Sequence, residues 1–300
     1  MSEFCWVNGQ RTSQISAFDR SVQYGDGFFT TLLVTQNRLY NWSAHWWRLQ
    51  NSAKQLGFPE LNEIEVRALI ESAYVDFSKE STTESPLSIK LIISRGVGGR
   101  GYQALEQPTI TTIVQINLHP VFTQTADLQK VQAPIELGLC STLCAIQPNL
   151  AGLKHLNRLE NVLARNELHS SPLAEAVMLN AYSEVVCATQ SNLFLIVGDR
   201  LITPKLNNSG VAGTTRFQMP AIAKSCGFEY REQVVSLQDL HKADELFLTN
   251  ALRGVMPVKQ FQQTKYSYDR VLQLHNAWSA WQTQNAERLN KQIDGKSVND

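Results

Sequence analysis

The sequence lacks an excess of basic charge, long apolar runs and a leader-like N-terminus. The 300 residues contain 27 lysines and arginines and 27 aspartates and glutamates, so the formal net charge is zero. Nucleic acids and anionic membranes attract clustered basic charge, and we expect neither as the main partner. Apolar runs are only strand-sized, and MSEFCWVNGQ has no basic stretch followed by an apolar one. We therefore expect no export and no membrane insertion, and a cytoplasmic protein by default.

Cysteine and histidine lack the spacings of a disulfide framework or a metal centre. The five cysteines form an odd set without a CxxC pair, which favours reduced thiols. Cys140 and Cys144 could pair across a strand, but we expect core thiols. The six histidines show neither HExxH nor another paired-ligand spacing. We therefore expect no metal site.

Apolar residues make up 43% of the chain, enough for one large domain or two modest ones. Short apolar runs predict strands, and helical patterns are interspersed without regular alternation. That order favours an α+β protein with mixed sheets and flanking helices over a doubly wound parallel sheet. We expect strands at 4–8, 28–41, 87–94, 109–117, 177–179, 185–196 and 246–249, and helices at 44–56, 63–77 and 266–291.

Two domains are expected from this pattern. A smaller N-terminal α/β domain would occupy residues 1–119. His119-Pro120 breaks a strand, so a linker is placed at 120–125. A larger domain would follow at 126–265, and a C-terminal helix and tail at 266–300.

The segment GLKHLNRLENVLAR contains the strongest candidate for covalent chemistry, Lys154. Apolar residues recur in it at helical spacing, at Leu156, Leu159, Val162 and Leu163. This pattern predicts an amphipathic helix that starts just after Lys154 and whose apolar face anchors it. A partly desolvated amine at the positive end of a helix has its protonated form disfavoured, as attack on a carbonyl requires. The alternative is a solvated surface lysine, which is the commoner case.

Six ordered motifs together resemble one enzyme family. They are FDRSVQYGDGFFTT at 18–31, SRGVGGRGY at 94–102, GLKHLNRLENVLAR at 152–165, QSNLF at 190–194, GVAGTTR at 210–216 and TNALRGVMPV at 249–258. The set resembles the 4-amino-4-deoxychorismate lyases, which are fold type IV pyridoxal-phosphate enzymes of aminotransferase class IV. The 94–102 loop is more similar to the lyases than to the transaminases. The resemblance implies a homodimer with a two-domain fold of the D-amino-acid aminotransferase type.

The resemblance also implies a site for pyridoxal 5'-phosphate. Lys154 would form the Schiff base and act as base and acid, and Thr30 is implied beside it as a second catalytic residue. Backbone N–H groups and hydroxyls at the start of a helix can face one anion. The implied phosphate and cofactor contacts are Gly213, Thr214, Thr215, Arg48, Asn250, Ala251 and Cys187. Taken singly, the arginine could be a solvated charge and the Gly-Thr-Thr a helix cap.

Cys187 departs from the family pattern. In the family a glutamate five residues before the asparagine of the NLF motif contacts the pyridine nitrogen. A thiol is a weak donor and acceptor and would leave that nitrogen unprotonated. Glu184 could replace it only through a bulge or register shift, because an odd offset on a strand points to the other face. Such a loss affects an elimination that creates an aromatic ring less than it affects transamination.

Substrate contacts are expected in the glycine-rich loop. Arg95 and Arg100 could bind the two carboxylates of aminodeoxychorismate, and Tyr24 and Tyr102 could be site aromatics. The alternatives are a flexible hairpin with solvated arginines and buried structural tyrosines. Leu33 stands where some relatives carry arginine.

Three functional hypotheses follow from the motifs and from Cys187. The first is a lyase that converts 4-amino-4-deoxychorismate to 4-aminobenzoate and pyruvate in folate biosynthesis. The second is a transaminase of the same fold that acts on D-amino or branched-chain amino acids. The third is a paralogue that binds the cofactor with little turnover, or a non-catalytic interaction protein.

Overall fold

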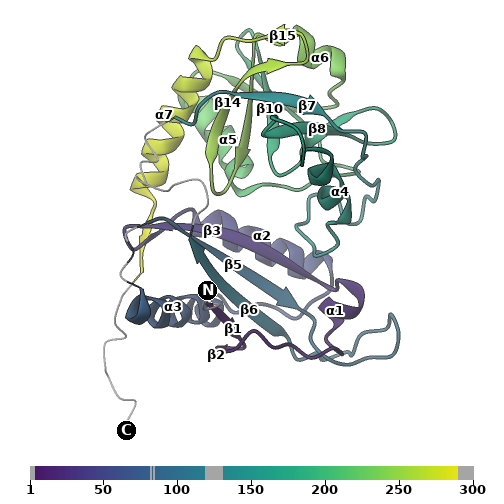
Figure 1. Cartoon of the computed structure of the whole chain (residues 1–300), viewed down its shortest axis with the longest axis vertical. Helices are drawn as coiled ribbons and strands as arrows, with labels where there is room; N and C mark the ends of the chain where they lie inside the picture. The colour runs from purple at the N-terminus through teal and green to yellow at the C-terminus, as the bar shows by residue number, and fades with distance from the viewer. Residues whose placement is uncertain (1–3, 82, 84, 119–130, 290–300) are drawn as a thin grey trace. The chain divides into compact units, whose positions relative to one another are not determined.

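The computed structural model describes residues 4–81, 83, 85–118 and 131–289. The chain divides into two compact units, Met1–Ala126 with Asn285–Asp300, and Asp127–Gln284 (Figure 1). The expected linker at 120–125 lies outside the described residues. The C-terminal helix belongs to the second unit, whereas the short strand after it belongs to the first.

The first unit is a seven-stranded sheet with three helices. Every strand pairing in it is antiparallel, in the order β16-β4-β3-β5-β6-β1-β2. Its strands are β1 (Cys5–Val7), β2 (Gln10–Arg11), β3 (Gly27–Thr35), β4 (Arg38–Leu39), β5 (Leu87–Ser94), β6 (Thr111–Leu118) and β16 (Glu287–Arg288). Its helices are α1 (Arg20–Tyr24), α2 (Trp42–Gln55) and α3 (Glu63–Glu80). The strand expected at 28–41 is interrupted because Gln36 and Asn37 adopt positive φ values of 49° and 59°, which closes a tight hairpin.

Alternation along the central strands gives this sheet two different faces. Phe28, Leu32 and Ile89 lie on the face that forms the core with residues of α2 and α3. Thr31 and Lys90 lie on the opposite face, where they are half-buried and pair across β3 and β5. The sheet thus leaves one face available for polar contacts.

The second unit is a nine-stranded mixed sheet with four helices. The strand order is β12-β11-β10-β13-β14-β7-β8-β9, and β15 pairs with β14. The pairings β11·β12, β14·β7 and β7·β8 are parallel, and the others are antiparallel. Its strands are β7 (Ile135–Leu139), β8 (Glu175–Leu179), β9 (Val185–Ala188), β10 (Asn192–Val197), β11 (Arg200–Pro204), β12 (Glu229–Gln233), β13 (Glu245–Asn250), β14 (Gly254–Phe261) and β15 (Thr264–Lys265). Its helices are α4 (Leu159–Glu167), α5 (Thr214–Ser225), α6 (Leu237–Lys242) and α7 (Asp269–Gln284).

Each unit has its own apolar core. One core lies between the seven-stranded sheet and α2 and α3, and another is built on the nine-stranded sheet. No helix in the described ranges is both long and apolar enough to cross a membrane. The α+β fold class with flanking helices that the sequence predicts is confirmed.

Candidate active site

Lys154 lies in an irregular segment and not at a helix start. α4 begins at Leu159, with Arg158 as its N-cap. Before it, Gly152 forms a strand-like bridge: its N–H donates to the Gly210 carbonyl at 3.0 Å, and its carbonyl accepts from the N–H of Ala212 at 2.9 Å. This bridge keeps the backbone from entering the helix early. The prediction of a helix that starts just after Lys154 is therefore wrong.

The apolar face of α4 does not anchor Lys154 either. Leu159, Val162 and Leu163 are 76%, 51% and 56% exposed, and Ala164 is the buried residue of the helix. Leu153 and His155 are buried on either side of the half-buried Lys154. The prediction failed because helical periodicity identifies an apolar face without showing what covers it.

His155 is buried next to the lysine and contacts the guanidinium of Arg158 through its ring nitrogens. Burial, and then the positive charges of Arg158 and Lys154, lower the pKa of His155 to about 4. The imidazole is therefore neutral at physiological pH. It contributes an acceptor to the guanidinium and no further positive charge beside Lys154.

The lowered pKa of His155 gives folding stability a pH dependence. Between pH 6.5 and about 4 the unfolded chain binds a proton at this histidine and the folded chain does not, so stability falls as the pH falls. The parent protein loses unfolding free energy between pH 7 and pH 5, and we expect His155→Gln to lose about 1 kcal/mol less over the same interval. Urea denaturation at both pH values measures this. His169→Gln, at an exposed histidine, is the control and should retain the parent slope.

The start of α5, in the second unit, contains the glycine and threonines expected to contact a phosphate. Gly213 is the N-cap, and its N–H donates to Asn192 Oδ1 at 3.0 Å. A side chain at Gly213 would place its Cβ 2.1 Å from that oxygen, so glycine is required there. Thr214 Oγ1 is buried without a hydrogen-bond partner among the described residues. Helix N–H groups and this hydroxyl together suit a phosphate.

Asn250 shapes the turn beside this helix start. Its Oδ1 accepts the N–H groups of Leu252 and Arg253 at 3.1 and 2.8 Å, and its backbone carbonyl accepts the Thr215 hydroxyl at 3.0 Å. Ala251 lies in the same turn and is half-buried. The expected residues 213–215 and 250–251 therefore form one continuous structure.

A buried carboxylate that the sequence did not reveal supports this turn. Glu175 accepts the hydroxyls of Thr189 and Ser191 at 2.6 and 3.4 Å, and Ser191 Oγ accepts from Asn250 Nδ2 at 3.1 Å. Burial raises the pKa of Glu175. A lone glutamate at the start of an apolar strand has no motif around it, so only the fold identifies its role.

Arg48, in the first unit, is a buried cation without a counter-ion. Its Nη2 donates to Thr30 Oγ1, and its Nε has no partner among the residues described. No carboxylate forms an ion pair with it within the described ranges. Burial lowers the pKa of Arg48 to about 10, so the group still carries its charge at neutral pH. A buried, unpaired guanidinium is costly unless an anion joins it.

Thr30 and Thr31 point to opposite faces of β3. Thr30 is fully buried and its hydroxyl lies 2.6 Å from His45 Nδ1. Thr31 is half-buried on the other face, opposite Lys90. The two threonines therefore have different environments, although the sequence places both in one motif.

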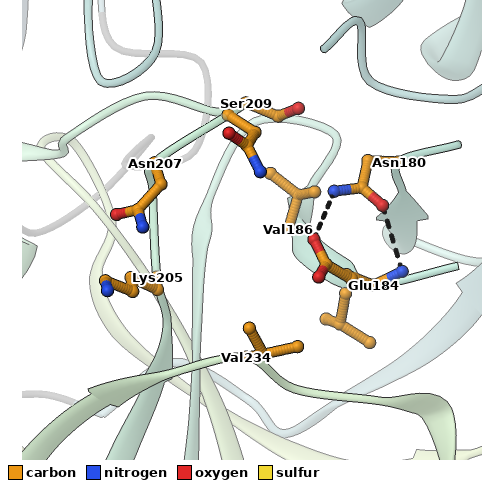
Figure 2. Close-up of a pocket in the computed structure, with 9 residues that line it drawn as sticks. Asn180, Glu184, Val186, Lys205, Asn207, Ser209 and Val234 are labelled. Carbon is orange, nitrogen blue, oxygen red and sulfur yellow. Dashed lines mark hydrogen bonds between the residues drawn. The ribbon is translucent and has the colours of Figure 1, made fainter. Parts of the chain in front are cut away.

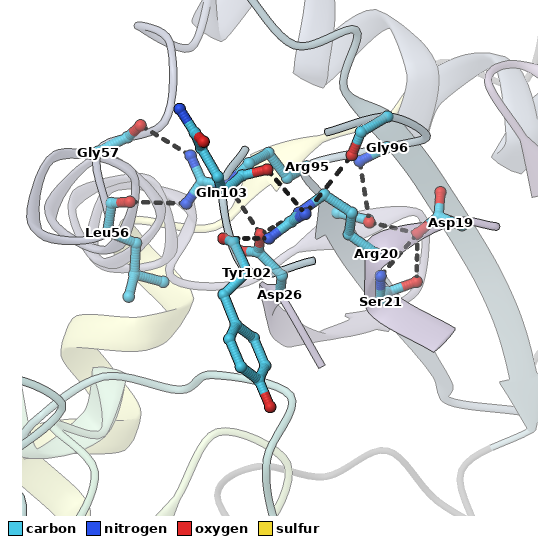
Figure 3. A network of polar contacts seen from close by, with 12 residues as sticks. Asp19, Arg20, Ser21, Asp26, Leu56, Gly57, Arg95, Gly96, Tyr102 and Gln103 are labelled. Carbon is cyan, nitrogen blue, oxygen red and sulfur yellow. Dashed lines mark hydrogen bonds and ion pairs between the residues drawn. The ribbon is translucent and has the colours of Figure 1, made fainter. Parts of the chain in front are cut away.

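Arg95 belongs to the scaffold of the glycine-rich loop. Figure 3 shows Asp26 between two arginines: its Oδ2 accepts from Arg20 Nε at 2.7 Å and from Arg95 Nε at 2.9 Å. The rest of the Arg95 guanidinium donates to the carbonyls of Leu56 and Gly57 at the end of α2, at 2.7 and 2.8 Å. We expected Arg95 to bind substrate, but the structure uses its donors to close this end of α2.

Arg100 and Tyr102 lie at the surface of the loop. Arg20 holds the loop through the carbonyls of Gly101 and Tyr102 at 3.0 and 2.9 Å. Tyr102 is 90% exposed, its ring centroid is 5.4 Å from that of Tyr24, and Arg20 lies 4.9 Å from the Tyr24 ring. Arg100 is exposed. The alternative of a buried structural tyrosine is therefore wrong for Tyr102.

Lys90 is a further candidate that motif analysis missed. Its amine lies 5.0 Å from the centroid of the Phe29 ring, on the half-buried face of β5. Burial lowers the pKa of Lys90, and the described residues include no ion-pair partner for it. Strand alternation could have placed it beside Thr31, but the partly buried environment could not be read from the sequence.

Cys187 is buried in an apolar cluster beneath α4. Its Sγ lies 3.9 Å from that of Cys144, and the cluster also contains Cys140, Met178 and Ala164. The contact with Cys144 and burial raise the pKa of Cys187 well above its usual value. It is therefore a neutral thiol, and none of the five cysteines is in a disulfide.

β9 contains a bulge, but the bulge does not bring Glu184 to the position of the missing family glutamate. The bulge lies between Met178 and Leu179, opposite Val186. Glu184 precedes the strand, and its carboxylate accepts from Asn180 Nδ2 at 2.7 Å. Glu184 lines a small pocket that is partly open to solvent, and Figure 2 shows Lys205 across from it.

A phosphate-bearing aldehyde cofactor requires an amine for the aldehyde and donors for the phosphate. Groups of these kinds occur in each unit: the half-buried Lys154 and the start of α5 in the second, and the buried Arg48 in the first. Among the described residues no group of three histidine, cysteine, aspartate or glutamate side chains could hold a metal ion. The chain belongs to the amino-transferase class IV family, whose model matches residues 27–261.

Individual relatives include lyases and aminotransferases. The chain is 36% identical over 259 residues to an aminodeoxychorismate lyase of Vibrio harveyi, covering 84% of this chain and 89% of the relative. It is 28% identical over 267 residues to a putative branched-chain-amino-acid aminotransferase of Methanocaldococcus jannaschii, covering 84% and 86%. The crystal structure of 4-amino-4-deoxychorismate lyase from Pseudomonas aeruginosa superposes with a TM-score of 0.78 at 33% identity, covering 89% and 95%.

The family depends on pyridoxal phosphate. Within the second unit, the unpartnered Thr214 hydroxyl fits a phosphate and Lys154 fits an aldehyde; in the first unit, the buried Arg48 is a cation that fits an anion. The neutral thiol of Cys187 differs from the carboxylate that the resemblance places at the pyridine nitrogen.

Proposed function

We propose that this protein is a pyridoxal-phosphate-dependent lyase that converts 4-amino-4-deoxychorismate to 4-aminobenzoate and pyruvate in folate biosynthesis. The observation that carries the proposal is the 36% identity to an aminodeoxychorismate lyase over 84% of the chain. The lyase-like loop at 94–102 and the segment around Lys154 support it. The family resemblance also supports a cytoplasmic homodimer.

The residues of the chain take separate roles in this proposal. When bound, the cofactor supplies an electron-withdrawing ring next to the reacting carbon. Lys154 would hold the aldehyde of the cofactor, and its amine would act as the base that takes the proton from the amine-bearing carbon and as the acid that returns one to the departing pyruvate. Thr214, Thr215 and Arg48 hold the phosphate, and the turn at Asn250 and Ala251 supports them.

Substrate contacts come from positively charged and aromatic groups of the first unit. Lys90 and Arg100 each supply a cation for a carboxylate, and Tyr24 and Tyr102 supply aromatic surface. Thr31 shares the face of β3 and β5 with Lys90. Arg95 contributes indirectly, because it fixes the loop that carries Arg100 and Tyr102.

Cys187 favours elimination over transamination. A neutral thiol does not keep the pyridine nitrogen protonated, so the ring withdraws electrons less strongly. Formation of the aromatic product ring supplies driving force that a transaminase lacks. The substitution is therefore more compatible with the lyase reaction.

The proposal is tested with purified protein, pyridoxal phosphate and aminodeoxychorismate. We expect 4-aminobenzoate and pyruvate in equal amounts. Amino-group exchange between D-alanine or branched-chain amino acids and 2-oxo acids, without 4-aminobenzoate, would instead identify a transaminase. A protein that gains no visible absorbance with pyridoxal phosphate would support the non-catalytic hypothesis.

Cys187→Glu should destabilise the protein before cofactor is added. The carboxylate would be buried among thiols, and the charges of Glu175 and Glu160 also act on this position. We expect the cofactor-free variant to lose about 2–4 kcal/mol of unfolding free energy at pH 7, and to recover part of it as the pH falls and the carboxylate protonates. Urea denaturation measures this. Cys187→Gln is the uncharged control of similar size and should show no such recovery.

Lys90→Met should raise KM by a larger factor than it lowers kcat. The variant keeps the length of the side chain but loses the charge for a substrate carboxylate, so we expect KM to rise about 10-fold and kcat to change less than about 3-fold. Steady-state assays of 4-aminobenzoate formation measure both constants. Lys54→Met, at an exposed position of α2, is the control. An unchanged KM in Lys90→Met would exclude this contact.

A further inference from the structure

A buried hydrogen-bonded chain connects α2 to β3 in the first unit. Arg48 Nη2 donates to Thr30 Oγ1, and Thr30 Oγ1 lies 2.6 Å from His45 Nδ1. His45 and Arg48 are three residues apart on α2, so they share one face of the helix. All three side chains are at most 5% exposed. His45 belongs to none of the expected site residues.

The chemistry of the guanidinium fixes the direction of the first hydrogen bond in this chain. A guanidinium has donors only, so Thr30 Oγ1 must accept from Arg48. The hydroxyl oxygen has a second lone pair, so the 2.6 Å contact is compatible with either Thr30 or His45 Nδ1 as the donor. We take the hydroxyl as the donor and Nδ1 as the acceptor, which puts the proton of a neutral His45 imidazole on Nε2. Each bond strengthens the next, because a hydroxyl that donates is also a better acceptor.

This chain determines where the guanidinium of Arg48 points. The hydroxyl of Thr30 can rotate, and the acceptor on His45 selects the rotamer whose lone pair faces Arg48. Arg48 Nε keeps its hydrogen without a partner among the described residues. The hydrogen bond from Nη2 therefore orients the guanidinium, while its Nε–H group has no acceptor among the described residues. A preorganised anion-binding group has these two properties.

We propose that His45, acting through Thr30, is a positioning residue that orients Arg48 toward the cofactor phosphate. The inference rests on the proposed function, since it takes pyridoxal phosphate as the ligand. It also gives Thr30 a different role from the catalytic one expected from the sequence. Thr30 lies on the helix-facing side of β3 and holds the arginine.

Paired ligands and paired variants test this proposal. His45→Leu removes the acceptor, whereas His45→Asn places an amide oxygen near the position of Nδ1. We expect His45→Leu to weaken pyridoxal phosphate binding about 10-fold and to change the binding of pyridoxal, which lacks the phosphate, less than about 2-fold. His45→Asn should recover most of the affinity. Fluorescence titration of both ligands measures this, with thermal melts as the check on folding.

Two further measurements separate positioning from structural damage. Thr30→Val should reproduce the phosphate-specific loss, and Arg48→Met combined with His45→Leu should bind no more weakly than Arg48→Met alone. ¹⁵N NMR of the cofactor-free protein should show His45 with an unprotonated Nδ1. Equal losses for pyridoxal and pyridoxal phosphate, or unchanged affinity in His45→Leu, would overturn the proposal. A parent protein that binds neither ligand would overturn the proposed function itself.

Discussion

Lys154→Ala is expected to remove both the visible absorbance of the protein with pyridoxal phosphate and its lyase activity. The amine binds the aldehyde and moves the proton, so no other described group replaces it in both roles. We expect turnover to fall at least about 1,000-fold. Absorbance spectra and 4-aminobenzoate formation measure the two effects.

The control for this prediction is Lys224→Ala, at an exposed position of α5. It should retain the absorbance band and the activity. Residual binding of pyridoxal phosphate to Lys154→Ala is expected, because the phosphate contacts remain. Unchanged turnover in Lys154→Ala would end the proposed mechanism.

Arg48→Met is expected to weaken binding of pyridoxal phosphate about 100-fold while raising the stability of the cofactor-free protein. The first effect follows from the loss of a buried charge for the phosphate. The second follows because the variant removes a desolvated cation for which the described part of the chain supplies no counter-ion, and we expect a gain of about 1–2 kcal/mol. Calorimetric titration and urea denaturation measure the two quantities.

Opposite changes in binding and stability distinguish a ligand site from a structural arginine. Arg38→Met, at an exposed position of β4, is the matched control and should change neither quantity. A large loss of stability in cofactor-free Arg48→Met would show that the arginine supports the fold, and would contradict its assignment to the phosphate.

The sequence predicted the local structure around the proposed phosphate contacts because these residues are neighbours in short motifs. Gly213, Thr214 and Thr215 start α5 as expected, and the Asn250 turn lies against them. Local rules for helix starts and turns are enough for such elements. The same rules failed at Lys154, because the bridge between Gly152 and Val211 depends on a segment almost sixty residues away.

Charged groups were predicted less well than backbone features. Arg95 and Arg100 are equivalent in the sequence of one loop, yet Arg95 bonds to Asp26 and the end of α2 while Arg100 is exposed. Glu175 and Lys90 lie in no recognisable motif. Burial alone lowers the pKa of Lys90, and burial is the main cause of the raised pKa of Glu175. Desolvation depends on what packs around a group, which sequence spacing does not specify.

By itself the sequence determined the fold class, the ordered motifs and the substitution at Cys187, because these depend on residue identity and local periodicity. Only the tertiary structure decided that Thr30 bonds to His45 and Arg48, that the α4 leucines are exposed, and that Cys187 contacts Cys144. Those outcomes depend on which distant segments exclude water from each side chain. Burial and pairing across long sequence separations are properties of the folded chain.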